Sequence, residues 1–410
     1  MKGSHNQQQG LAMLILVFMI ALTSTAYLLN IINVSSIKSE RDKLTANTLA
    51  EAKSALIGFS IKENIADSAR LPNPDLMLAL LPEGSQAGAA GSINHSLVGR
   101  FPWRSLGTEP LRDGWGECLW YVVSGKFKTS PATTSVLNWD TLGQIDVLDK
   151  NGVVIASNLA AMVIASNSLL PGQDRVAFPA EPTPVCGGNY DARNYLDAYN
   201  AVNAMFGEVN YFQGSINNRA ASNTNNKRFV QVRNDFYNDS FVFITTEDIY
   251  SRLIVRNEFS NQISALLNDP DFITIISEIN ISSEKGTGNL DLNCGCTIPS
   301  CSQARFISNS NNRDFCTNWK EMLLVTALAS PTSIIIDGVS TPPCERVVIF
   351  GGQRIGLQSR LTALDKSNPA NYLEGSNLDA FETPTAANDN FVGNSTFSAS
   401  ASSADVMRCI

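Results

Sequence analysis

The chain begins with an abrupt change from polar to apolar residues. A short polar leader, MKGSHNQQQG, ends at Gly10, and residues 11–37 that follow it contain no charged side chain. The apolar part, residues 11–32, is long enough to cross a bilayer as a helix. Because neither proline nor glycine occurs between Leu11 and Ile57, the pattern predicts one helix that continues well beyond the apolar part.

The second half of this predicted helix is amphipathic. Its apolar residues recur at near-helical spacing: Ile37, Leu44, Leu49, Ala52, Leu56 and Phe59. Three prolines between residues 72 and 82 then end the helical pattern. A helix over residues 11–66 would be about 80 Å long at 1.5 Å per residue. Its first half would lie in lipid and its second half would cover a globular head.

The chain after the helix predicts an α+β head built on antiparallel strands. The turn RDGWG precedes a strand-like run over residues 118–123, and we expect Trp115 and Trp120 to be largely buried. The segment QIDVLDKNGVVIAS, residues 144–157, predicts a hairpin because Asn-Gly favours the tightest strand connections. Residues 159–167 fit a buried strand or a short helix.

Two later segments predict further elements. A strand that ends near Thr245 leads into a helix from about Thr246, with Glu247 and Asp248 in its first turn. Residues 333–352 predict two strands joined by a Pro-Pro turn. The expected division of the chain is a leader (1–10), an N-terminal helix (11–66, of which 11–32 transmembrane), a globular α+β region (67–185), an Asn- and Cys-rich insertion (186–330) and C-terminal strands with a mobile tail (331–410).

Composition excludes several classes of function. The net charge is -8, only 17% of residues are charged, and no basic patch is visible, so nucleic acid is not an expected partner. Only two histidines occur, His5 in the leader and His95 in a glycine-flanked stretch, which argues against a His-dependent enzyme. No phosphate-binding loop, nucleophile elbow or cluster of metal ligands is found. We therefore expect neither enzymatic activity nor a cofactor.

The eight cysteines admit two interpretations. The segment CGCTIPSC could bind zinc, but it lacks paired CxxC motifs and has no histidine nearby. An even number of cysteines behind an apolar N-terminal segment favours disulfides in an oxidising compartment. The candidates are Cys118, Cys186, Cys294, Cys296, Cys301, Cys316, Cys344 and Cys409, and their connectivity stays open.

Three interpretations of the N-terminal segment compete. A cleaved secretory signal could end at Ser24-Thr25-Ala26, but apolar residues continue beyond that site and Lys2 is the only firm positive charge ahead of it. An ordinary membrane anchor explains the length of the apolar segment but not the glycine in front of it. A leader that a peptidase removes at Gly10 explains both features.

This third pattern resembles the leader of type IV pilins and of the pseudopilins of type II secretion. The resemblance covers residues 1 to about 59, and the turn Asp-x-Trp-Gly before an aromatic strand is similar to the start of the pseudopilin sheet. It implies that a prepilin peptidase cleaves between Gly10 and Leu11, and that the new N-terminus is methylated. It also implies a single pass of the bacterial inner membrane, with the N-terminus in the cytoplasm, the head in the periplasm and other pilin subunits as partners.

The chain departs from the family at one position. The fifth residue of a mature pilin is usually glutamate, and here it is Ile15, an absence shared by a group of minor pseudopilins. With the large head, this departure favours a minor subunit at the tip of a pilus or pseudopilus. The alternative is a periplasmic binding protein or hydrolase on an ordinary anchor. The sequence does not distinguish a pilus from a secretion pseudopilus.

Overall fold

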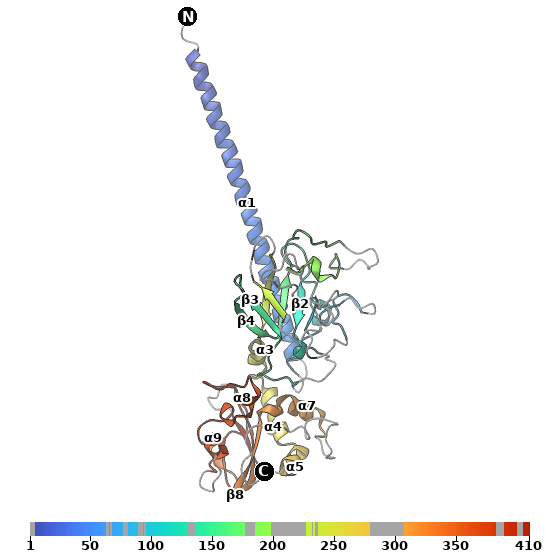
Figure 1. Ribbon diagram of the computed structural model, residues 1–410, viewed down its shortest axis with the longest axis vertical. Coiled ribbons are helices and arrows are strands. Elements are labelled where there is room, and N and C mark those ends of the chain that lie inside the picture. The colour runs from blue at the N-terminus through green and yellow to red at the C-terminus, as the bar shows by residue number, and fades with distance from the viewer. Residues whose placement is uncertain are drawn as a thin grey trace.

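The fold is α+β with antiparallel sheets, and a single long helix leads into it (Figure 1). The computed structural model describes residues 5–62, 65, 68–76, 81–88, 93, 96–129, 136–176, 185–197, 227–231, 233, 237–278, 307–382, 389–399 and 405–410, with only the backbone of 5–12, 25–34, 193, 227 and 228.

Helix α1 spans His5–Lys62, which confirms the prediction of one continuous helix. Its 58 residues correspond to a length of about 87 Å. Figure 1 shows its first half standing clear of the head and its second half running along the head. Among the described side chains, which stop at residue 24 and resume at residue 35, no helix offers a stretch long and apolar enough to cross a membrane.

The part of the head nearest α1 is built in three layers. Its central sheet has the order β1-β2-β5-β7 and is antiparallel throughout. Helix α1 packs on one face of this sheet against β5 and β7, and a small sheet of order β4-β3-β6 covers the other face. The strands are β1 (Leu97–Arg100), β2 (Trp120–Val123), β3 (Ile145–Leu148), β4 (Val154–Leu159), β5 (Ala161–Ala165), β6 (Lys227–Val230) and β7 (Ser240–Ile244), with the short helix α2 (Trp103–Leu106) between β1 and β2.

Strand β2 shows why a run of apolar residues forms the centre of this sheet. Successive side chains of a strand point to opposite faces. Tyr121 and Val123 lie in the core beneath α1, whereas Trp120 and Val122 lie in the core beneath the small sheet. Both faces are covered, so all four residues are buried, as expected for Trp120.

The C-terminal part of the head lies beyond the first part, at the end farthest from the N-terminus (Figure 1). Its main sheet has the order β13-β11-β8, and a smaller sheet has the order β10-β9-β12. Helix α3 (Thr246–Leu253) still belongs to the first part and packs against α1. The helices of the C-terminal part are α4 (Asn257–Leu267), α5 (Pro270–Glu278), α7 (Ser310–Trp319), α8 (Ala363–Ser367) and α9 (Gly375–Glu382); the strands are β8 (Leu323–Thr332), β9 (Ile335–Ile336), β10 (Val339–Ser340), β11 (Cys344–Phe350), β12 (Val392–Gly393) and β13 (Val406–Cys409).

Several local predictions are confirmed. Residues 144–157 form the β3–β4 hairpin, whose turn is held by amides of Asn151 and Val153 that donate to Asp149. Gly152 takes the left-handed conformation there, with φ +79°. Thr245 caps α3, and its hydroxyl and the Asp248 carboxylate bond each other's backbone amides. These predictions succeeded because each depends on neighbours within four residues.

The predicted connection of two strands within residues 333–352 was wrong. The tight turn within residues 333–352 is Asp337-Gly338, where both residues have positive φ, and it joins β9 to β10 rather than lying at the Pro-Pro pair. Strand β11 pairs instead with β8 and β13, which are distant in sequence. A separate observation concerns residues 389–399, which belong to an Asn- and Ser-rich stretch near the C-terminus. The side chains of Phe391 and Phe397 in this segment are buried in the core.

Candidate functional site

Residues 13–22 of the projecting half of α1 are apolar on every side of the helix. Large apolar side chains between residues 13 and 22 each keep between 53% and 70% of their surface exposed: Met13, Leu14, Ile15, Leu16, Val17, Phe18, Met19, Ile20 and Leu22. Covering them would yield on the order of 1 kcal/mol each, or about 10 kcal/mol in all. That amount is comparable to the stability of a whole domain. This half of α1 therefore requires an apolar environment or partner.

Thr23, the first polar side chain after this run, is adapted to such an environment. The hydroxyl of Thr23 donates to the carbonyls of Met19 and Ile20, at 2.9 and 3.0 Å. A hydroxyl bonded to its own helix does not need water. Within residues 13–23, α1 thus presents no unsatisfied polar side-chain donor and no charge.

The predicted processing residues fall in the same half of α1. Gly10 and Leu11 belong to the helix, but their surroundings lie outside the described side chains. Ile15 is described, is 53% exposed and has apolar neighbours along the helix. No described feature of the chain supplies a carboxylate at this level of α1.

The second half of α1 is held against the head by a short apolar face. Leu49, Ala52 and Leu56 are buried against the sheet, as the spacing predicts. The prediction fails for Ile37 and Leu44, which are 51% and 52% exposed. At the level of these two residues, the described part of the head contacts α1 through a loop and not through the apolar face of the sheet.

That loop is the turn RDGWG, and Asp113 organises it. One oxygen of the Asp113 carboxylate accepts from the amides of Trp115 and Glu117, and the other accepts from the amide of Asn167 at the end of β5, at 2.8 Å. Burial raises the pKa of Asp113, and these three amides oppose the rise. The turn is therefore fastened to the central sheet.

The same turn touches the backbone of α1. The amide of Gly114 donates to the hydroxyl of Thr45 at 2.9 Å. A Cβ on Gly114 would overlap the backbone of Arg41, so only glycine permits this approach. Trp115 is consequently half-buried beside α1, with the Arg41 guanidinium 5.7 Å from its ring centre. Of the two tryptophans expected to be largely buried, Trp120 is fully buried, whereas Trp115, beside Arg41 of α1, stays partly exposed.

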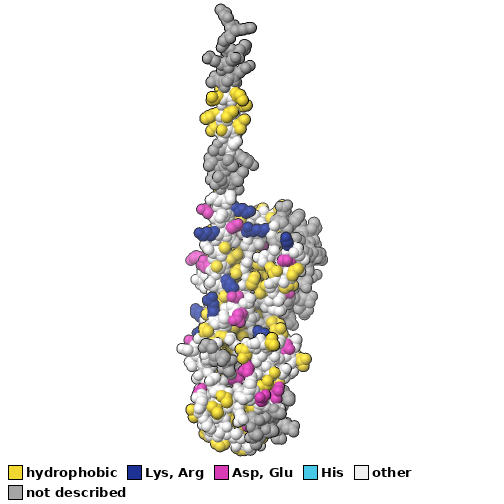
Figure 2. Space-filling model, turned by 90° about the vertical axis from the view of Figure 1, so that its left-hand side faces the viewer, with side chains coloured by type: hydrophobic (Ala, Val, Ile, Leu, Met, Phe, Trp, Pro, Cys, Tyr) yellow, Lys and Arg dark blue, Asp and Glu magenta, His cyan; other side chains and the backbone are white. Residues whose placement is uncertain are grey.

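Two adjoining cavities lie beside Trp115, and we call them together the collar groove. The first, of about 260 Å³, is lined by Ile37, Lys38, Arg41 and Trp115. The second, of about 300 Å³, shares Lys38 and Trp115 and is also lined by Arg233, Tyr237 and amide side chains. Arg233 pairs with Asp42 of α1, with two N–O distances of 3.2 Å. Figure 2 shows Lys and Arg side chains gathered, with acidic ones among them, where α1 enters the head.

Two buried carboxylates lie on the head side of this groove. The Asp197 carboxylate accepts from the amides of Asn238 and Asp239, and the Asp239 carboxylate accepts from the amide of Asp197. Within the described residues, the second oxygen of each carboxylate has no hydrogen-bond partner. Burial raises the pKa of Asp197 to about 7, and burial together with the nearby Asp197 carboxylate also raises the pKa of Asp239 well above its ordinary value.

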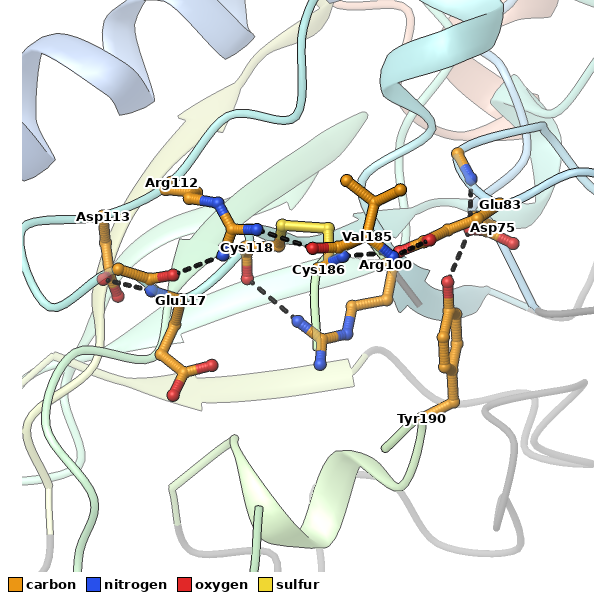
Figure 3. The surroundings of a disulfide bond; sticks show 12 residues. Asp75, Glu83, Arg100, Arg112, Asp113, Glu117, Cys118, Val185, Cys186 and Tyr190 are labelled. Carbon is orange, nitrogen blue, oxygen red and sulfur yellow. Dashed lines mark hydrogen bonds between the residues drawn. A yellow bond between two sulfur atoms is a disulfide. The ribbon is translucent and has the colours of Figure 1, made fainter. Parts of the chain in front are cut away.

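A disulfide between Cys118 and Cys186 closes this part of the head (Figure 3). Arg112 donates to the carbonyls of Gly116 and Val185 at 2.6 and 2.7 Å. The Glu83 carboxylate accepts from the amides of Val185 and Cys186. The disulfide and these contacts fasten the chain at residues 185–186 beside the turn that touches α1.

The other cysteines are also consistent with an oxidised chain. Cys344 and Cys409 form a second disulfide, which links β11 to β13. Cys316 is disulfide-bonded as well, whereas Cys294, Cys296 and Cys301 lie outside the described residues. Within the described residues no cysteine is free, and no group of three or more His, Cys, Asp or Glu side chains is placed to hold a metal ion.

Sequence reasoning missed Arg233 and the pair Asp197 and Asp239, which come from segments far apart in the chain. Lys38 and Arg41 could have been singled out, because they are the first basic residues after the charge-free segment.

No protein family, curated protein or solved structure matches the chain.

Proposed function

We propose that the chain is a large minor subunit of a type IV pilus or of a type II secretion pseudopilus, anchored by α1 and located at the filament tip. The observation that carries this proposal is the division of α1 into two halves. One half is an uncharged, exposed apolar rod, and the other is the packed edge of an antiparallel α+β head. A helix of this kind can anchor a precursor in a bilayer and later pack among neighbouring helices in a filament core.

The disulfides support the side of the membrane on which the head lies. Disulfides persist outside the cytoplasm and are uncommon within it. Two are described in full, and they lie in the two different parts of the head. In this proposal the head is therefore periplasmic and the leader is cytoplasmic.

Processing is the direct test of the proposal. Mass spectrometry of the mature chain should find an N-terminus at Leu11, and a Gly10→Leu variant should keep its leader. A mature N-terminus near Tyr27 would show a cleaved secretory signal and refute the proposal. An intact leader in the wild-type chain would favour the alternative, a periplasmic protein on an ordinary anchor.

The tip position rests on Ile15. In the pilin family a glutamate at this place offsets the positive N-terminus of a neighbouring subunit in the filament core. An unpaired charge in apolar surroundings is costly, and Ile15 cannot provide the partner. Such a subunit is best accommodated where no earlier N-terminus needs neutralising, which is the tip. Its large two-part head would also crowd a helical shaft.

Quantitative proteomics of sheared filaments tests the tip position. We expect a few copies of this chain for each filament, far fewer than of the main shaft subunit. The Ile15→Glu variant should enter the shaft more readily or disturb initiation. Equal abundance with the shaft subunit would exclude the tip, and an Ile15→Glu variant with unchanged location and initiation would count against the charge argument.

A further inference from the structure

The collar groove combines two kinds of surface in one small space. Its cationic groups are Lys38 and Arg41 of α1, and its apolar walls are Ile37 and the ring of Trp115. Arg233 already has a carboxylate partner in Asp42. Lys38 forms no ion pair within the described residues, and Arg41 lies over an aromatic ring. The groove therefore offers positive charge beside an apolar wall, which suits an amphiphile with an anionic group.

The position of the groove along α1 is defined by helix geometry. Lys38 and Arg41 lie six and nine residues after Ile32, the end of the apolar segment, or about 9 and 14 Å along the axis. The polar layer of a bilayer extends about 5–8 Å beyond its hydrocarbon core. Side chains of a helix lean toward its N-terminus, and long basic side chains extend further in that direction. Both cations of an anchored chain consequently reach the lipid headgroups.

Two further observations point to lipid. Tryptophan is enriched at membrane interfaces, where its ring is apolar and its N–H remains hydrated, and Trp115 is half-buried at the same level. Basic residues beside a membrane segment are usually cytoplasmic. In the proposed orientation Lys38 and Arg41 lie on the opposite side of the membrane, so the cytoplasmic preference of basic residues does not explain their presence.

From these observations we propose that the collar groove binds the headgroups of anionic phospholipids and thereby holds the head in one orientation on the membrane before assembly. The anionic phosphate pairs with Lys38 and Arg41, and the glycerol and upper acyl carbons contact Ile37 and Trp115. This inference rests on the proposed function, because only an anchored α1 brings the groove to the membrane surface.

The test uses the full chain in lipid nanodiscs that carry a headgroup-attached spin label. The label quenches nearby tryptophans, and the difference between wild type and Trp115→Phe isolates the signal of Trp115. We expect stronger quenching of Trp115 in phosphatidylcholine mixed with phosphatidylglycerol than in phosphatidylcholine alone, with loss of the difference at high salt. Each basic residue near an anionic surface contributes about a fivefold factor. Lys38→Gln with Arg41→Gln should thus lower the equilibrium constant for docking about 25-fold.

The control variant Lys150→Gln with Arg252→Gln changes the net charge by the same amount as the test variant, at two exposed positions away from the groove. In this control variant the lipid label should quench Trp115 as strongly as in the wild type. Equal quenching in both lipids, or no effect of the Lys38 and Arg41 substitutions, would overturn the inference while leaving the anchor intact. If Trp115 were quenched only in discs that hold several chains, the inference would also be overturned. That result would indicate that the positive groove binds an acidic surface of a neighbouring protein. A chain that fails to enter the discs would overturn both this inference and the proposed function.

Discussion

The buried pair Asp197 and Asp239 should make the head more stable in mild acid than at neutral pH. The decisive substitution is Asp197→Asn, which keeps an oxygen to accept from the amides of Asn238 and Asp239 and removes one ionisable group. The new amide can also donate toward the second oxygen of Asp239, which has no partner within the described residues.

The magnitude follows from the pKa of Asp197, which burial raises from 3.8 to about 7. Below pH 3.8 both folded and unfolded chains hold the proton, so the group has no effect on stability. Between pH 3.8 and 7 the folded chain holds it longer, and the free energy of unfolding falls as the pH rises. The full loss, at most about 4 kcal/mol at 1.36 kcal/mol per pH unit, is reached above pH 7.

The assay is thermal unfolding of the detergent-solubilised chain, followed by near-ultraviolet circular dichroism from about pH 4.5 to 8. Asp197→Asn should raise the melting temperature at pH 8 and flatten its decline with pH. Asp197→Ala should lower it at every pH, because two buried amides lose their acceptor. Asp405→Asn is an independent second test, since burial also raises the pKa of Asp405 to about 7 at a separate site, and it should likewise flatten the decline of the melting temperature with pH. A pH profile of Asp197→Asn parallel to the wild type would refute the reasoning.

Three further substitutions test the contacts between α1 and the head, each by thermal unfolding. Gly114→Ala should cost about 1–3 kcal/mol because the new Cβ overlaps the helix backbone, whereas Gly88→Ala, with no atom within 4 Å, should change little. Leu56→Ala should cost about 2–5 kcal/mol, and Leu44→Ala, at a residue 52% exposed, should cost less than about 1 kcal/mol; equal losses would contradict the observed packing. Reducing Cys118–Cys186, which are 68 residues apart, should cost up to about 4 kcal/mol, and a Cys118→Ser, Cys186→Ser variant that melts like the oxidised wild type would exclude any role in stability.

The sequence predicts those parts of the fold that depend on nearby residues. The continuity of α1 follows from the absence of proline and glycine between Leu11 and Ile57, the β3–β4 hairpin from Asn151-Gly152, and the start of α3 from the cap at Thr245. The pairing of β11 with β8 and β13 could not be predicted, because each of these strands is apolar and nothing local specifies its partner.

The candidate site shows the same limit. An apolar stripe on a helix does not say where its cover ends, so Ile37 and Leu44 looked equivalent to Leu49. The difference arises from the turn RDGWG, which approaches α1 through a glycine and keeps the sheet at a distance there. Likewise, Asp197 and Asp239 are ordinary acidic residues in the sequence. They become a buried pair only because the loop before β7 meets the chain at residue 197.

The two parts of the head are joined through buried aromatic and charged side chains. Trp139, from the part nearest α1, lies 4.6 Å from Trp319 and 6.1 Å from Phe350 of the other part, measured between ring centres. Asp140, the next residue, is fully buried and pairs with Arg360, also fully buried. Removing either partner of such a pair would strand a buried charge, so separating the two parts is costly. In the proposed tip position, a load on the distal end would be carried through Trp139 and Asp140 to the central sheet, and from the sheet through Leu49 and its neighbours to α1.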